Sequence, residues 1–217
     1  MVITRLERPE QVKATVGKSA SKTKKIRVYI DEVYSFYLYG SDLSDYGLEE
    51  GRELPEEVYH ELLWEVIFPR GKEKALNLLK FRDRTEAELL RRLTEEGYPQ
   101  LIIQRVISYV MDYGYLNDER YASNYIKLRK SSKSRLVLMA ELTAKGISKE
   151  LINQVFATEY EEQEEDPEQT AILKAIHKKT QDPSTLNREE KQKLMSYLYP
   201  KGFSTEKINK ALQVSQE

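Results

Sequence analysis

The side chains that most often perform catalysis or bind metals are scarce in this sequence. The 217 residues include two histidines, His60 and His177, and no cysteine. Histidine is the usual proton shuttle near neutral pH, and neither histidine stands at a spacing typical of metal ligands. Without cysteine, disulfides, thiolate metal sites and thiol nucleophiles are excluded. We therefore expect no catalytic residue, no metal site and no cofactor.

One short motif could suggest nucleotide binding. Gly17-Lys18-Ser19 reproduces the end of a P-loop, but that loop needs a glycine five residues before Gly17, where this chain has Val12. Neither the dinucleotide-binding glycine pattern nor the nucleophile-elbow pattern occurs in the sequence. The sequence therefore predicts a protein that is not an enzyme.

Basic residues are the remaining candidates for function, since lysine and arginine can bind phosphates or an acidic protein face. The candidate contacts are Arg82, Arg84, Arg91, Arg92, Lys127, Arg129, Lys130, Lys133 and Arg135. Tyrosines are interleaved with them and allow two interpretations, stacking on bases or packing in a core, of which we favour the core. These tyrosines are Tyr109, Tyr113, Tyr115, Tyr121 and Tyr125.

Charge is segregated along the chain although the net charge is only −1. Residues 1–30 carry eight basic and two acidic residues, and residues 31–69 carry one basic and eleven acidic residues. Residues 70–135 carry fifteen basic and nine acidic residues. Such blocks could offer one face to phosphates and another to a basic protein. The acidic stretch from Glu159 to Glu168 is interpreted as a solvated linker, with mimicry of phosphate charge as the alternative.

An internal repeat is the most informative feature of the sequence. It is centred on Gly97, Gly146 and Gly202, and apolar residues recur eight, seven and four positions before each glycine and one, six, nine and ten after it. The apolar positions form one face of a helix before the glycine and one face of a helix after it. The three copies are therefore tandem repeats of one helical unit.

The residues between the two faces explain how each unit is built. Glycine just past a helix end permits the left-handed backbone that ends the helix. Ser148 and Ser204 can then cap the following helix, and Thr85 with Glu88 forms a capping box at the start of the first copy. An upstream apolar helix precedes each copy, so the pattern predicts three three-helix modules in an elongated arrangement.

The first part of the chain follows a different pattern. Alternating apolar residues at 26–30 and a second β-rich run at 33–39 predict a hairpin that turns at Asp31-Glu32, and residues 2–6 could add a third strand. Residues 16–25 are predicted to form a mobile basic loop. A helix follows from Pro55, and we expect Pro69-Arg70-Gly71 to end it.

We therefore expect a mainly α-helical chain with a small β-rich region at its start. The predicted segments are an N-terminal β-rich extension (1–54), a connecting helix (55–70), module 1 (71–112), module 2 (113–160), an acidic linker (161–168) and module 3 (169–217). No apolar run approaches the roughly 20 residues needed to cross a bilayer. We expect a cytoplasmic monomer without membrane contact.

One segment between the first two modules resembles the signature of a known family. That signature is a turn followed by L-N/D-D-E-R/K-aromatic-A, and the matching residues here are Tyr115, Leu116, Asn117, Asp118, Glu119, Arg120, Tyr121 and Ala122. The later segment from Glu141 to Ile147 and the earlier one from Arg84 to Tyr98 also match. The family is RecX, and the resemblance runs from about Ala75 to the C-terminus. Asn117 is in addition a good helix N-cap.

The resemblance implies both a fold and a role. RecX proteins are built from tandem three-helix repeats and bind the filament that RecA forms on DNA. The expected partners are therefore RecA and DNA, contacted directly or through the filament, and the expected role is negative modulation of recombination, ATP hydrolysis and the SOS response. A stand-alone DNA-binding repeat protein is the alternative.

Overall fold

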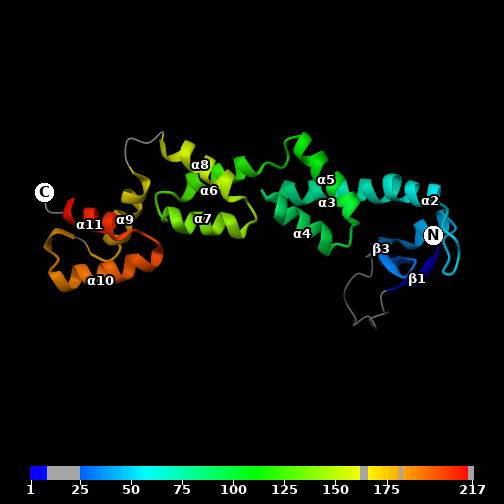
Figure 1. Ribbon diagram of the computed structural model, residues 1–217, viewed down its shortest axis with the longest axis horizontal. Coiled ribbons are helices and arrows are strands. Elements are labelled where there is room, and N and C mark those ends of the chain that lie inside the picture. The colour runs from blue at the N-terminus through cyan, green and yellow to red at the C-terminus, as the bar shows by residue number, and fades with distance from the viewer. Residues whose placement is uncertain (9–24, 162–165, 181–182, 215–217) are drawn as a thin grey trace, which may run out of the picture. The chain divides into compact units, whose positions relative to one another are not determined.

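The computed structural model describes residues 1–8, 25–161, 166–180 and 183–214 (Figure 1). The chain divides into two compact units. The first comprises Met1–Arg82 with Leu89–Leu116, and the second comprises Asp83–Glu88 with Asn117–Glu217.

The first unit begins with a three-stranded antiparallel sheet of order β1-β2-β3. Its strands are β1 (Ile3–Glu7), β2 (Ile26–Ile30) and β3 (Val33–Leu38). Asp31 and Glu32, with φ of 47° and 67°, form the two-residue turn that fits the twist of a hairpin. The predicted hairpin and third strand are confirmed. Of the predicted basic loop, residues 16–24 lie outside the described part of the chain.

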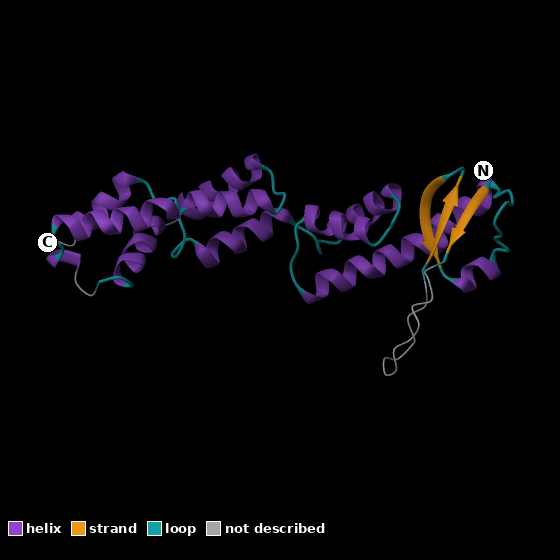
Figure 2. Ribbon diagram, turned by 90° about the horizontal axis from the view of Figure 1, so that it is seen from below, coloured by secondary structure: helices purple, strands orange, loops and turns teal. Residues whose placement is uncertain are grey.

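The two faces of this sheet differ in chemistry. One face is buried and carries Ile3, Val28 and Phe36, each 1% exposed. Figure 2 shows the sheet lying against the helical segment that begins at α2 (Glu56–Glu61), and the ring of Phe36 lies 6.0 Å from that of Tyr59. On the other face, Arg5 lies over the ring of Tyr29 and Arg27 donates to the carboxylate of Glu7. Helix α1 (Gly40–Asp45) follows the sheet.

The helix after Pro55 does not stop where we expected. The π-helix η1 (Leu62–Ile67) continues α2, and α3 (Phe68–Phe81) continues η1 without a break. The predicted end at Pro69-Arg70-Gly71 is therefore wrong. Pro69 falls in the first turn of α3, directly after the wider π-helical turn, where its missing N–H and its ring are tolerated. Gly71 is buried, and a Cβ there would lie 3.2 Å from Val106.

The remaining helices form the three modules, and the predicted fold class is confirmed. Each module has an upstream helix and then the pair that flanks a repeat glycine. Gly97, Gly146 and Gly202 have φ of 89°, 86° and 80°, so each adopts the left-handed backbone. Module 1 uses α3, α4 (Glu86–Glu95) and α5 (Gln100–Asp112); module 2 uses α6 (Asp118–Arg129), α7 (Arg135–Ala144) and α8 (Lys149–Glu161); module 3 uses α9 (Pro167–His177), α10 (Arg188–Leu198) and α11 (Thr205–Val214), with the short 3₁₀ helices η2 (Pro183–Thr185) and η3 (Tyr199–Lys201).

Most repeat positions are buried as predicted. The residues eight and four positions before each glycine, and those one, six, nine and ten after it, belong to the buried core. The position seven before the glycine is an exception. Leu90 is exposed, and Met139 and Met195 are half-buried. That position lies at the edge of the apolar face rather than at its centre.

A hydroxyl joins successive copies of the repeat in the second unit. Thr85, in the cap of α4, donates to the carbonyl of Lys145 at 2.7 Å, and Ser134, in the cap of α7, donates to the carbonyl of Lys201 at 2.7 Å. Both hydroxyl residues are fully buried, and both stand twelve positions before a repeat glycine. Each therefore caps its own helix and satisfies a carbonyl in the glycine turn of the next copy.

The two ends of the predicted acidic linker are not solvated. Glu159 is buried within α8 and is 5% exposed, and Glu168 is buried in the first turn of α9 and is 7% exposed. Asp166 caps α9, because its side chain accepts the N–H of Glu168. Residues 162–165, at the centre of the predicted linker, lie outside the described part of the chain.

Candidate binding surfaces

The basic residues predicted in module 2 gather where α6 ends and α7 begins. We call Lys127, Arg129, Lys130, Lys133 and Arg135 the module-2 basic loop. Lys127 lies 3.2 Å and Lys130 3.7 Å from the buried carboxylate of Glu159. Lys130 also donates to the main-chain carbonyl of Glu159 at 2.8 Å. These two lysines therefore hold α6 against α8 as well as adding positive charge.

The other three cations of the loop also touch neighbours within the module. Lys133 pairs with Glu141, which in turn accepts the hydroxyl of Tyr125 at 2.8 Å. The guanidinium of Arg129 lies 4.0 Å from the centre of the Tyr125 ring. Arg135 is exposed and lies 4.9 Å from the ring of Phe156. Three of the five cations pair with the carboxylates of Glu141 and Glu159, and the two arginines lie against aromatic rings, so the loop keeps an excess of positive charge.

The arginines predicted in module 1 are dispersed. Arg82 and Arg91 are exposed, and Arg84, which belongs to the second unit, is half-buried. Arg92 pairs with Glu95, the last residue of its own helix, and with Glu96 just past it, at 3.2 Å in each case. An exposed pair within one helix contributes little to stability, on the order of 0.5 kcal/mol.

The family-like motif is mainly structural. Asn117 caps α6 by accepting the N–H of Arg120 at 2.7 Å, as predicted. Asp118 accepts the N–H of Glu86 at 2.9 Å and so caps the start of α4 as well. Burial raises the pKa of Asp118. Leu116 and Ala122 are buried core residues, whereas Glu119 and Arg120 are exposed.

Tyr121 of the motif belongs to the same junction. The amine of Lys145 lies 5.4 Å from the centre of its ring and pairs with Glu88 at 2.9 Å. Lys145 also offers the carbonyl that Thr85 binds. The motif and the glycine turn of module 2 thus meet at the first turn of α4.

The predicted burial of the tyrosines is only partly correct. Tyr109, Tyr121 and Tyr125 are half-buried against their cores, but Tyr113 is 65% and Tyr115 is 52% exposed. The prediction that Tyr113 and Tyr115 pack in a core is therefore wrong. Their rings are stacked, with centroids 6.4 Å apart and planes 17° from parallel.

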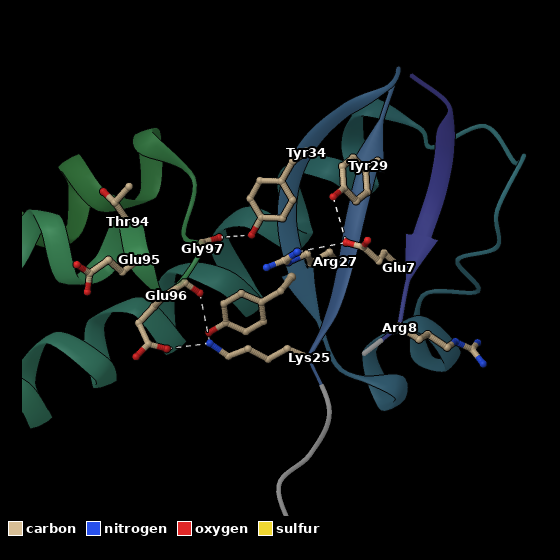
Figure 3. Close-up of a pocket in the computed structure, with 11 residues that line it drawn as sticks. Glu7, Arg8, Lys25, Arg27, Tyr29, Tyr34, Thr94, Glu95, Glu96 and Gly97 are labelled. Atoms are coloured by element: carbon tan, nitrogen blue, oxygen red, sulfur yellow. Dashed lines mark hydrogen bonds and ion pairs between the residues drawn. The ribbon is translucent and has the colours of Figure 1, made fainter. Parts of the chain in front are cut away.

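A polar groove of about 870 Å³ lies in the first unit, between the outer face of the sheet and the end of α4 (Figure 3). Lys25 donates to the Glu96 carboxylate at 2.9 Å, and Tyr34 donates to the Gly97 carbonyl at 2.6 Å. On the opposite wall, Glu7 accepts hydrogen bonds from Arg27 and Tyr29. Most charges in this groove are thus neutralised within the protein. The hydrogen bonds of Lys25 and Tyr34 connect the sheet to the glycine turn of module 1.

Glu96 is the electrostatic centre of this junction. Partial burial would raise the pKa of Glu96, but hydrogen bonds from Lys74 and Lys25 outweigh burial and lower the pKa to about 2. A carboxylate with a lowered folded-state pKa stabilises the fold above its unfolded pKa and loses that effect as the pH falls through the folded pKa.

We therefore expect the stability difference between the native chain and Glu96→Gln to be largest near neutral pH. It should shrink between about pH 5 and pH 2, because the Glu96 carboxylate is protonated first in the unfolded chain and then in the folded chain. Urea denaturation followed at several pH values measures this difference. Glu95→Gln is the matched control, since Glu95 is 52% exposed and pairs with Arg92. A difference that is constant with pH would contradict the expectation.

Sequence patterns do not predict the roles of several residues that are important to these surfaces. Lys25, Glu96 and Lys145 act through contacts more than 50 positions away in the chain, which no local pattern reveals. The sequence does contain a signal for the hydroxyl contacts between successive copies, because Thr85 and Ser134 occupy the same repeat position.

Neither a metal site nor a membrane span is found in the described part of the chain. In residues 1–8, 25–161, 166–180 and 183–214, no group of three or more histidine, aspartate or glutamate side chains is placed to hold a metal ion. No helix in the same ranges has both the length and the apolar character of a membrane span.

Comparison with known proteins gives matches in all three modules. Residues 72–109 match the first three-helix domain of RecX, residues 117–155 the second and residues 166–212 the third. The regulatory protein RecX of Caldanaerobacter subterraneus subsp. tengcongensis is 31% identical over 195 residues, covering 89% of this chain and 95% of that protein. The regulatory protein RecX of Bacillus subtilis is 28% identical and covers 91% of this chain and 74% of that protein.

Solved structures show the same fold. A crystal structure of a regulatory protein RecX has a TM-score of 0.55 at 20% identity and covers 96% of this chain and 97% of that one. A crystal structure of RecX from Lactobacillus salivarius has a TM-score of 0.56 at 23% identity, covering 68% of this chain and 96% of that one. With three consecutive RecX domains and a curated relative that matches over most of its length, this chain belongs to the RecX family.

Proposed function

We propose that this chain binds the RecA filament and its DNA in the cytoplasm, without catalysis of its own, and negatively modulates recombination, ATP hydrolysis and the SOS response. The observation that carries the proposal is the succession of three RecX domains along one chain. Relatives that match most of the chain are named regulatory proteins. A series of modules also offers several contact points to a repeating partner.

The module-2 basic loop is the proposed contact with DNA phosphates or with an acidic face of the filament. Its five cations outnumber the two carboxylates with which three of them pair, and Lys127 keeps 59% of its side chain exposed. Positive charge of this kind steers association with a polyanion and weakens as salt rises. The same observation favours the second candidate function, that of a stand-alone DNA-binding protein.

Binding to preformed filaments separates the two candidates. The chain is titrated against RecA–single-strand filaments and against the same DNA without RecA, at one salt concentration. Our proposal predicts clearly tighter binding to the filament. Equal affinity for bare DNA, with no effect of RecA, would favour the stand-alone function instead.

Charge removal in the loop tests the contact itself. We expect the triple variant Lys127→Gln, Lys133→Gln and Arg135→Gln to bind filaments more weakly. The salt dependence of its binding should also fall, by about 0.7 in logarithmic slope for each lost contact to single-strand phosphate.

The control triple variant removes three exposed lysines of module 3, with Lys174→Gln, Lys178→Gln and Lys193→Gln. It changes the net charge equally and should bind filaments like the native chain. Equal weakening by the two variants would show that net charge, rather than the loop, governs binding.

A further inference from the structure

A row of aromatic rings crosses the first unit, from η1 and α3 to the end of α5. Figure 1 shows α3 and α5 side by side. The centroids of Trp64 and Phe68 are 5.9 Å apart, those of Tyr109 and Tyr113 are 4.6 Å apart, and those of Tyr113 and Tyr115 are 6.4 Å apart. We call this row, together with the lysine described next, the aromatic stripe.

Lys72 links the two halves of the aromatic stripe. Its amine lies 6.0 Å from the Phe68 ring and 5.1 Å from the Tyr109 ring. A second cation, the exposed Arg105, stands one helical turn before Tyr109 and so lies on the same face of α5. From Trp64 through Lys72 to Tyr115, neighbouring groups of the stripe for which the structure gives a contact are 4.6 to 6.4 Å apart.

The stripe is exposed most at the end of α5. Trp64, Phe68 and Tyr109 are half-buried and pack against the core of the unit, whereas Tyr113 and Tyr115 are 65% and 52% exposed. A single exposed ring is common on a protein surface, but exposed rings that adjoin one another can mark a binding site. The half-buried rings fix the position of the row, and the two tyrosines present their surfaces to solvent.

A row of rings interrupted by a cation suits one class of ligand well. Successive unpaired bases stack on aromatic side chains, while lysine or arginine holds the backbone between them. A protein partner is more often bound by a broad apolar patch with a polar rim than by a row one side chain wide. We propose that the aromatic stripe binds single-stranded nucleic acid through its unpaired bases.

The charges near the stripe set how this binding depends on salt. The stripe region has two cations, Lys72 and Arg105, and two acids, Glu65 and Asp112, that adjoin Trp64 and Tyr113 in the sequence, so its formal charges balance. Stacking, rather than charge, therefore supplies most of the affinity. Binding through the stripe loses less affinity with salt than binding through the module-2 basic loop.

This inference deepens the DNA contact of the proposed function and rests on it only in part. Base stacking needs no RecA, so it can be measured with bare DNA. The chain could inhibit RecA with a stripe that binds nothing, or bind single strands without affecting RecA. Failure of the proposed function and failure of the base-stacking proposal would therefore give different experimental results.

The test uses the full chain and a single-stranded oligonucleotide. Trp64 is the only tryptophan in the sequence, so its fluorescence reports directly on the stripe. We expect addition of the oligonucleotide to quench it. The double variant Tyr113→Ala and Tyr115→Ala should bind at least about thirtyfold more weakly, since stacking on both rings is lost.

Three controls isolate stacking from folding and charge. The variant Tyr113→Phe and Tyr115→Phe keeps both rings and should bind like the native chain. Tyr199→Ala removes a tyrosine of module 3 that is 66% exposed and should have no effect. An abasic oligonucleotide and a DNA duplex should bind the native chain and the double alanine variant equally, because neither offers unpaired bases.

Several results would overturn the proposal. Unchanged Trp64 fluorescence, or equal binding of the oligonucleotide by the double alanine variant and the native chain, would exclude base stacking at the stripe. An equal loss of abasic binding would assign the effect to structure or charge. If the variant bound single strands normally but no longer bound RecA filaments, the stripe would be a protein contact instead.

Discussion

Replacement of Gly146 with alanine should strongly destabilise the second unit, although it adds only one methyl group. A left-handed backbone costs a residue with a Cβ about 1–2 kcal/mol, and Gly146 has a φ of 86°. The added Cβ would also stand 2.2 Å from the Cβ of Ala87. Overlap of this kind adds about 1–3 kcal/mol. Denaturation by urea, followed by circular dichroism, measures the loss.

Two comparisons separate the backbone cost from the overlap. Gly114 also has a positive φ, of 69°, but a Cβ there would meet nothing within 4 Å, so Gly114→Ala should cost only the backbone part. Compared with Ala87→Gly alone, which carries the helix cost of glycine, the double variant Ala87→Gly and Gly146→Ala should show only the backbone part of the loss. If Gly146→Ala and Gly114→Ala cost the same, the close contact between the glycine turn and α4 would not exist in solution.

Replacement of Arg70 with alanine should cause the second large loss of stability. Arg70 binds the buried carboxylate of Asp42 through two hydrogen bonds, of 2.7 and 2.8 Å, and Asp42 also accepts the N–H of Tyr39. The Asp42 side chain is only 8% exposed. Arg70→Ala leaves this charge buried without its partner, which costs about 3 kcal/mol. Urea denaturation of the first unit at neutral pH measures the loss.

The pH dependence of this variant has a definite sign. Burial acts to raise the pKa of Asp42, but the hydrogen bonds from Arg70 and Tyr39 lower it overall. The native pair therefore stabilises the fold above the unfolded pKa of aspartate and loses that effect as the pH falls through the lowered folded pKa. Without Arg70, only the Tyr39 N–H opposes the effect of burial, so the pKa of Asp42 should be higher than in the native chain. The stability loss should therefore be largest at neutral pH and smaller in acid.

A double variant provides the control for this prediction. Asp42→Asn with Arg70→Ala removes the buried charge but keeps an acceptor for Tyr39. It should be more stable than Arg70→Ala alone, because an unpaired buried charge costs more than the absence of the pair. If the double variant were the less stable of the two, Asp42 would not be a buried charge that depends on Arg70.

The repeat could be predicted from the sequence because it depends on local rules. A glycine past a helix end, a cap and apolar residues at helical spacing are readable without the fold, and all three occur around Gly146. The hairpin was readable for the same reason, from alternation on both sides of Asp31-Glu32. The exposure of the position seven before each glycine could not be predicted in this way, since Leu90 lies at the edge of the apolar face.

The candidate surfaces could be predicted less well because they depend on tertiary contacts. Glu159 looked like part of a solvated acidic run, yet two lysines of α6 hold it in a buried position. Tyr113 and Tyr115 looked like core residues, and only the packing of α5 shows that they are exposed. Pro69 looked like a helix end, and only the π-helical turn before it explains why the helix continues.

Restraint of RecA by this member of the RecX family is tested most directly by strand exchange. RecA-catalysed exchange between a single strand and a homologous duplex is followed while this chain is added in increasing amounts. We predict a dose-dependent loss of exchange, accompanied by a fall in RecA ATP hydrolysis. Undiminished exchange and hydrolysis with this chain present at stoichiometric amounts would contradict the proposed function.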